Sequence, residues 1–242
     1  SVHPQQQAQQ AKQPTVRQVI VLLDGTYPMS HYWASLYKTC VYPALTYLEI
    51  KGKTDPSMRT DFSLVVFYSH APHGDRLLKQ YTFTPKLTTF DNWARNVEFE
   101  GGGSSSSAVT EGLYTAIDSF DWGGSDDGPR TVERFVLMAT NSRQYDGVPC
   151  RLPAAESVDF AELIKIVVAR EVHLSIFLPH SADVLRTAYT RVWSNLRGSS
   201  VTREVALPDL DHLAFLRNIP LVPSTTDRNM LLLPPAPNAA AA

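Results

Sequence analysis

The sequence predicts an α/β fold: a doubly wound, mostly parallel sheet of six strands with helices on both faces. The first observation is the run of five aliphatic residues at 19–23, which is typical of a strand buried on both faces. The second is that such runs alternate six times along the chain with segments whose apolar residues recur every three or four positions. The breaks between these segments are short, which favours parallel strands joined by crossover helices.

The first fifty residues predict an arm, a strand and a long helix. Residues 1–15 are rich in Gln and poor in apolar side chains, so we expect a disordered arm. The first strand should cover residues 16–23. A helix should follow from Ser30, a good N-cap, to about residue 49. Pro43 lies inside this helix and should kink it.

The next fifty residues predict two strands and a short helix. Residues 62–68 form a second apolar run of strand length. In residues 77–84, Tyr81 and Phe83 alternate with polar neighbours, as in a half-exposed strand, so we expect one antiparallel edge strand here. A helix capped by Thr89 should end near residue 97.

A Gly/Ser-rich stretch at residues 101–107 leads into the middle of the chain. The apolar spacing predicts a helix from residue 109 to about residue 120 and a strand at 134–139. Residues 140–158 should be a long irregular segment. The Gly/Ser-rich stretch at 101–107 resembles a phosphate-binding turn. It lacks the lysine of a P-loop and the spacing of a dinucleotide fingerprint, so a flexible capping loop is favoured.

The last elements begin with Asp159 and Glu162, a capping pair that should open a helix. We then expect a strand at 172–178, a helix capped at Ser181 and a final strand at 212–219. This gives one folded domain, residues 16–223, between the arm and a Pro/Ala-rich linker or tail, residues 224–242.

Composition narrows the classes of partner. A hydrophobic content of 43% can form a sizeable core, and a net charge of -2 gives no reason to expect direct binding of nucleic acid. No apolar stretch approaches the roughly 18 residues that would span a bilayer. Cys40 and Cys150 lie far apart, which favours a reducing compartment and two buried, unpaired thiols. The histidines have no metal-ligand spacing and the Gly-x-Ser-x-Gly turn of hydrolases is absent, so we expect no catalytic residue and no small-molecule substrate.

Asp24, Gly25 and Thr26 directly follow the first strand. Ligands of open α/β sheets bind outside the carboxyl ends of the strands, so this turn is the place to expect a site. It resembles the first loop of the von Willebrand A fold, Asp-x-Ser-x-Ser, whose oxygens bind Mg²⁺ together with residues of two later loops. Here Pro28 replaces the second hydroxyl and Asn141 stands where the later carboxylate is expected.

The resemblance therefore implies a degenerate site made of Asp24, Thr26, Ser104 and Asn141, and we predict no bound metal and no cofactor. The alternative to metal binding is that Asp24 and Thr26 bond to the neighbouring Gly/Ser loop and hold this edge of the sheet together.

Several motifs, in this order, are similar to the von Willebrand A domains of the Mediator subunit 25 family. They are residues 61–67 (DFSLVVF), 99–104 (FEGGGS), 110–116 (TEGLYTA), 172–176 (VHLSI) and 212–223 (HLAFLRNIPLVP). The resemblance implies a nuclear, non-enzymatic module of a transcriptional coactivator, which attaches its subunit to other Mediator subunits. The alternative function is that of a metal-dependent adhesion or ligand-binding von Willebrand A domain.

The sequence indicates only two candidate regions for the partner-binding surface. Loops on a rigid scaffold often carry function, which favours the loops after the strands. Our candidates there are Tyr27, Met29, Ser105 and Arg143. An apolar patch on an outer helix is the other possibility.

Overall fold

The fold is seen in a computed structural model that describes residues 15–70, 77–102, 107–123, 131–142, 152, 158–179 and 230–233. It contains a six-stranded sheet in the order β3-β2-β1-β4-β5-β6. The strands are β1 (Thr15–Asp24), β2 (Met58–Phe67), β3 (Leu78–Gln80), β4 (Thr131–Ala139), β5 (Val172–Pro179) and β6 (Met230–Leu233). Every neighbouring pair is parallel except β2 and β3, so the predicted fold class is confirmed, antiparallel edge included.

The register of the sheet brings three strand ends together. Asp24 at the end of β1 pairs with Phe67 of β2, and Leu23 pairs with Ala139 of β4. The loops that leave these strands therefore start side by side. We call this end of the sheet the loop edge; it comprises residues 24–27, 68–70, 100–102, 107 and 139–142.

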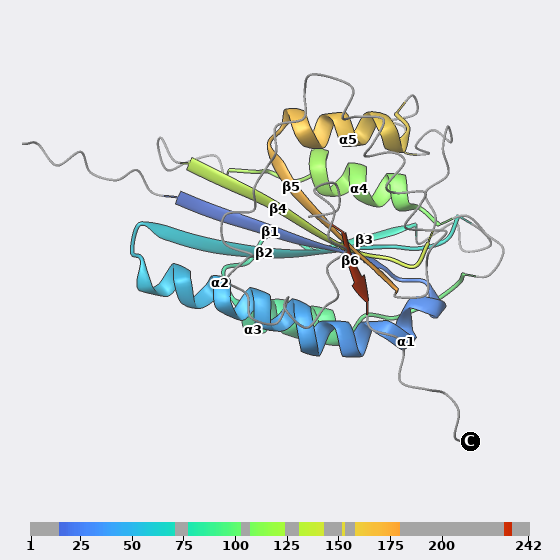
Figure 1. The fold of residues 1–242 in the computed structure, drawn as a ribbon, viewed down its shortest axis with the longest axis horizontal. Coiled ribbons are helices and arrows are strands. Elements are labelled where there is room, and N and C mark those ends of the chain that lie inside the picture. The colour runs from blue at the N-terminus through green and yellow to red at the C-terminus, as the bar shows by residue number, and fades with distance from the viewer. Residues whose placement is uncertain are drawn as a thin grey trace, which may run out of the picture.

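Helices cover both faces of the sheet (Figure 1). On one face lie α1 (Tyr27–Leu36), α2 (Tyr42–Thr54) and α3 (Leu87–Arg95), and on the other lie α4 (Val109–Asp118) and α5 (Phe160–Ala169). Successive side chains of a strand point to opposite faces. Val21 of β1 accordingly belongs to the core under α1–α3, while Leu22 belongs to the core under α4 and α5. This double burial explains the unbroken aliphatic run of β1.

The first helix differs from its prediction at both its start and its middle. It begins at Tyr27 rather than at Ser30, because Thr26 is the N-cap and Pro28 occupies the first turn, where a missing N–H costs nothing. A π-helical segment, η1 (Tyr37–Val41), separates α1 from α2. There the Tyr42 N–H donates to the Tyr37 carbonyl, five residues back. This wider turn directly precedes Pro43, whose ring would clash with a regular helix.

Smaller differences concern the sheet edge and the helix caps. The antiparallel strand β3 is shorter than expected, and Thr84 joins β2 through a separate bridge to Phe62. Lys86, not Thr89, is the N-cap of α3. The predicted cap of α5 is confirmed, since the Asp159 carboxylate accepts the Glu162 N–H at 2.8 Å.

The carboxy-terminal part requires one correction. The helix and strand expected at 181–193 and 212–219 lie outside the described residues, as do Cys150 and the arm before Thr15. β6 falls within residues 224–242, expected as a tail, yet its Met-Leu-Leu-Leu run pairs with β5. That apolar run should have been assigned to the sheet. Within the described residues, no helix has the length and hydrophobicity needed to span a bilayer.

Candidate functional site

Asp24 is the centre of the loop edge. Its side chain is fully buried, and each of its carboxylate oxygens accepts hydrogen bonds from this chain. Oδ1 accepts the backbone N–H of Thr26 at 3.0 Å. Oδ2 accepts the hydroxyls of Thr140 at 2.9 Å and Ser142 at 2.5 Å. All three contacts are donors, which suits an ionised carboxylate that can only accept.

A chain of hydroxyls continues from Asp24 across the loop edge. The single proton of the Ser142 hydroxyl goes to Asp24, so the Ser107 hydroxyl, 2.8 Å away, must donate to Ser142. The Thr140 oxygen also accepts the Ser142 N–H at 2.9 Å, which closes a tight turn after β4. Three segments that are distant in sequence are thereby joined through one buried carboxylate.

Backbone contacts tie the same loops together. The Gly25 N–H donates to the Phe67 carbonyl at 2.8 Å, and the Glu100 N–H donates to the Gly25 carbonyl at 2.9 Å. Gly25 is required here because a Cβ at this position would lie 2.5 Å from side-chain atoms of Val66 and Tyr68. Tyr27 adds a bond from its N–H to the Gly101 carbonyl at 3.2 Å.

Burial dominates the electrostatics of Asp24. Removal from water raises the pKa of the Asp24 carboxyl above its ordinary value, and the hydrogen bonds from Ser142, Thr26 and Thr140 oppose this rise. Nearby, a buried pair joins the loop after β2 to α4, with His70 Nε2 3.0 Å from Glu111 Oε1. The hydrogen bonds of Asp24 and the His70–Glu111 pair are both internal contacts that hold the loops of this edge to the rest of the fold.

The described residues of the loop edge are a poor donor set for Mg²⁺, which requires about six oxygens in octahedral geometry. Their one fully buried carboxylate, that of Asp24, is already bonded directly to two hydroxyls. Pro28 offers no side-chain oxygen and serves the start of α1 instead. No group of three His, Cys, Asp or Glu that could hold a metal occurs in the part of the chain that the structure describes.

The predicted site residues have different fates. Asp24 and Thr26 meet as expected, but the later loop reaches Asp24 through Thr140 and Ser142, which flank Asn141. Ser104, Ser105 and Arg143 lie outside the described residues.

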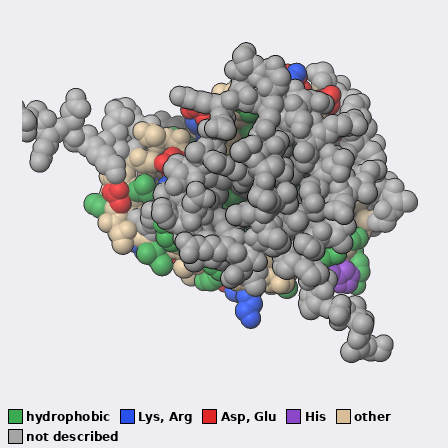
Figure 2. Space-filling view, in the orientation of Figure 1, with side chains coloured by type: hydrophobic (Ala, Val, Ile, Leu, Met, Phe, Trp, Pro, Cys, Tyr) green, Lys and Arg blue, Asp and Glu red, His purple; other side chains and the backbone are tan. Residues whose placement is uncertain are grey.

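Of the partner-binding candidates, Met29 was a wrong choice. It is fully buried, because the start of α1 at Tyr27 turns it toward the core. Tyr27 is 60% exposed and meets the exposed His31 ring edge-on at 5.5 Å. In Figure 2, hydrophobic and histidine side chains lie together at this end of the molecule.

Sequence reasoning missed the roles of Thr140 and Ser142. The available signal was a pair of hydroxyls two residues apart directly after a strand that is parallel to β1. Such a pair can bond a carboxylate at the end of the neighbouring strand without a metal ion between them.

Comparison with known proteins identifies the family. The family described as "Mediator complex subunit 25 von Willebrand factor type A" matches residues 13–219. Mediator of RNA polymerase II transcription subunit 25 from Danio rerio is 26% identical over 85% of this chain and 30% of its own length. The Homo sapiens subunit is 28% identical over 73% of the chain and 24% of its own length. The Arabidopsis thaliana subunit is 24% identical over 79% of the chain and 25% of its own length.

The chain thus spans between about a quarter and a third of the length of these relatives. Among solved structures, the SpRpn10 VWA domain has a TM-score of 0.43 at 12% identity, covering 93% of this chain and 90% of that one. The pilus adhesin SpaC of Lactobacillus rhamnosus GG has a TM-score of 0.44 at 11% identity, covering 78% and 27%. The family match covers most of the chain, and the chain belongs to the Mediator complex subunit 25 von Willebrand factor type A family.

Proposed function

We propose that this domain is a non-enzymatic interaction module that attaches its protein to other Mediator subunits in the nucleus, and that the loop edge carries the contact. The observation that supports this most directly is the state of Asp24. The carboxylate at the usual ligand position of the fold is buried and bonded on both oxygens by Thr26, Thr140 and Ser142. It holds loops in place and is not presented to a ligand.

The same contacts weigh against chemistry at this edge. A catalytic acid or base must reach a substrate within hydrogen-bonding distance. Asp24 has no exposed surface, and its neighbours Ser142 and Thr140 already donate to it. A metal-dependent adhesion function would require the bond between Asp24 and Ser142 to open.

Tyr27 is the side chain on this edge best suited to bind a protein. Among the described residues, Tyr27 and Ile50 are the large hydrophobic side chains that remain exposed, at 60% and 53%. Tyrosine is enriched at the centres of protein interfaces because it combines a large apolar ring with a polar tip. Tyr27 is also held rigidly, since its backbone both starts α1 and bonds to Gly101.

The test compares two exposed positions. The chain is expressed with an affinity tag in nuclei, and co-purified Mediator subunits are quantified by mass spectrometry for the wild type, Tyr27→Ala and Ile50→Ala. Loss of a central aromatic contact costs at least about 2 kcal/mol, or about thirtyfold in affinity. We expect Tyr27→Ala to reduce recovery of Mediator and Ile50→Ala, near the far end of α2, to leave it unchanged.

Recovery with Tyr27→Ala equal to that of the wild type would remove the loop edge as the contact surface. Failure of the wild type to recover Mediator would contradict the attachment role itself. Melting temperatures of both variants control for folding.

A further inference from the structure

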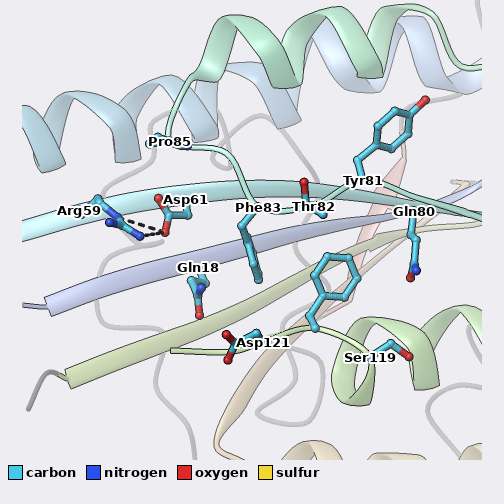
Figure 3. A pocket seen from close by; sticks show the side chains of 11 residues that line it. Gln18, Arg59, Asp61, Gln80, Tyr81, Thr82, Phe83, Pro85, Ser119 and Asp121 are labelled. Atoms are coloured by element: carbon cyan, nitrogen blue, oxygen red, sulfur yellow. Dashed lines mark hydrogen bonds and ion pairs between the residues drawn. The ribbon is translucent and has the colours of Figure 1, made fainter. Parts of the chain in front are cut away.

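A second candidate site lies at the end of the sheet opposite the loop edge. It is a hollow of about 400 Å³ (Figure 3). We call it the Asp61 pocket and define it by six of its lining residues: Gln18, Arg59, Asp61, Phe83, Phe120 and Asp121. It is separate from every contact discussed above, so it goes beyond the proposed attachment through Tyr27.

Register explains why polar groups lie beneath this hollow. Gln18 of β1 pairs directly with Asp61 of β2, so the two side chains are neighbours on one face of the sheet. Their face is the one covered by α4, which ends at Asp118. Beyond that end the chain turns through Asp121, and Gln18 and Phe83 extend from the sheet side toward it in Figure 3.

Asp61 is only half satisfied. Its Oδ2 accepts Arg59 Nη2 at 2.7 Å and Nε at 3.2 Å. Its Oδ1 has no hydrogen-bond partner in the described part of the chain. It has no contact with water to replace one, because the residue is only 2% exposed. An unsatisfied buried acceptor is costly and uncommon in native proteins, so its retention calls for an explanation.

The chemistry of the pocket favours a flat cation with N–H donors. The neighbouring amide oxygen of Gln18 is already occupied by the Gly123 N–H at 2.8 Å, which leaves Asp61 Oδ1 as a buried acceptor without a partner among the described residues. Asp61, Asp121 and Arg59 sum to one negative charge, which one monovalent cation would balance. Phe83 and Phe120 pack edge-to-face, with ring centroids 5.3 Å apart, and provide aromatic walls. A guanidinium group both donates to carboxylates and stacks on rings, whereas an ammonium group does the first better than the second.

A continuous polypeptide fits the surroundings better than a free small molecule. A second hollow, of about 480 Å³, shares Phe120 and Asp121 with the first and extends past Arg134 to Glu171. A chain whose side chain enters the Asp61 pocket can therefore continue along the adjoining hollow. We infer that the Asp61 pocket receives an arginine side chain of an extended segment of a partner protein.

Nuclear magnetic resonance titration of the 242-residue chain tests this inference. The probe is the capped pentapeptide Gly-Gly-Arg-Gly-Gly; its counterparts carry citrulline, which has the same shape without charge, or lysine, and ethylguanidinium represents a free small molecule. We expect the arginine peptide to shift the signals of the Gly123 N–H and the Gln18 amide and to bind about tenfold more tightly than the citrulline peptide. It should also bind more tightly than the lysine peptide and ethylguanidinium.

Variants assign the contact. Asp61→Asn should weaken binding about tenfold, since it removes the charge of the unpaired carboxylate acceptor. Asp121→Asn should weaken binding by a smaller factor. Because Asp121 is exposed, this variant still tests the pocket if the buried Asp61→Asn variant fails to fold. Asp159→Asn is the matched control on α5, because asparagine is an equally good N-cap.

Four results would overturn the inference. The first is the absence of shifts at saturating peptide, as expected if Asp61 Oδ1 binds only water. The second is equal binding of the arginine and citrulline peptides, and the third is ethylguanidinium binding as tightly as the arginine peptide. The fourth is a response to acetate at the same signals, which would assign the pocket to anions held by Arg59.

Discussion

The bond from the Ser142 hydroxyl to Asp24 provides the sharpest test of how the loop edge is held. In Ser142→Ala, Asp24 Oδ2 loses the donor at 2.5 Å and keeps the Thr140 hydroxyl. The Ser107 hydroxyl also loses its acceptor at 2.8 Å. A hydrogen bond to a charged group contributes about 1.5–3 kcal/mol. We therefore expect the free energy of unfolding to fall by about 2 kcal/mol.

Calorimetry and urea unfolding measure this loss. In domains of about 150–250 residues, 1 kcal/mol lowers Tm by about 2–4 °C, so Ser142→Ala should melt about 4–8 °C below the wild type. Ser30→Ala is the matched control, because its hydroxyl bonds the Tyr27 carbonyl at an exposed position, and its change should stay within about 0.5 kcal/mol. A loss in Ser142→Ala no larger than that in Ser30→Ala would refute the reasoning.

The remaining predictions concern the charge of Asp24, the packing of α4 and metal binding. Burial raises the pKa of Asp24 above 3.8, so its contribution to stability is present below that pH and is lost as the pH rises through the folded-state pKa. Asp24→Asn should accordingly gain stability relative to the wild type as the pH rises above about 4. Urea unfolding at a series of pH values measures the difference in unfolding free energy between the two proteins, and a difference that stays constant with pH would contradict the prediction. Gly112→Ala should lower stability by about 1–3 kcal/mol despite better helix propensity, since its Cβ would lie 2.9 Å from Phe67 Cδ1. Gly52→Ala, whose nearest contact is 3.3 Å away, is the control, and an unchanged Tm for Gly112→Ala would refute the close approach. Millimolar Mg²⁺ should leave Tm unchanged, because only a ligand of the folded state raises it; a rise that Asp24→Ala abolishes would show that the carboxylate can open to a metal.

The sheet was predictable from the sequence because hydrophobic burial determines its pattern. The aliphatic run of β1 requires apolar cover on both faces, and the helical stripes that alternate with it supply that cover. The interruption between α1 and α2 was less predictable. Pro43 signalled a disturbance, but periodicity does not say whether a kink or a π-turn accommodates the ring.

The loop edge was predictable in place but not in contacts. Asp24 follows a buried strand, so its position was expected. The partners Thr140 and Ser142 depend on the path of an irregular loop, which no periodic pattern encodes. Pro28 shows the same limit: in the sequence it marks a missing metal ligand, whereas in the structure it starts α1 and lies close to Gly102, where a Cβ would be 2.8 Å from the proline ring.

Two buried aspartates distinguish the two ends of the sheet. Asp24 accepts donors on both oxygens from its own chain, so hydrogen bonds offset part of the cost of its burial, and its role is to hold loops. Asp61 is buried to a similar degree, but within the described part of the chain only one of its oxygens has hydrogen-bond donors, and the residue lines a hollow. The cost of an unpaired acceptor is removed when a donor arrives from outside. By this reasoning the aspartate at the usual ligand position of the fold is the structural one, and the aspartate at the opposite end is the one available to a partner.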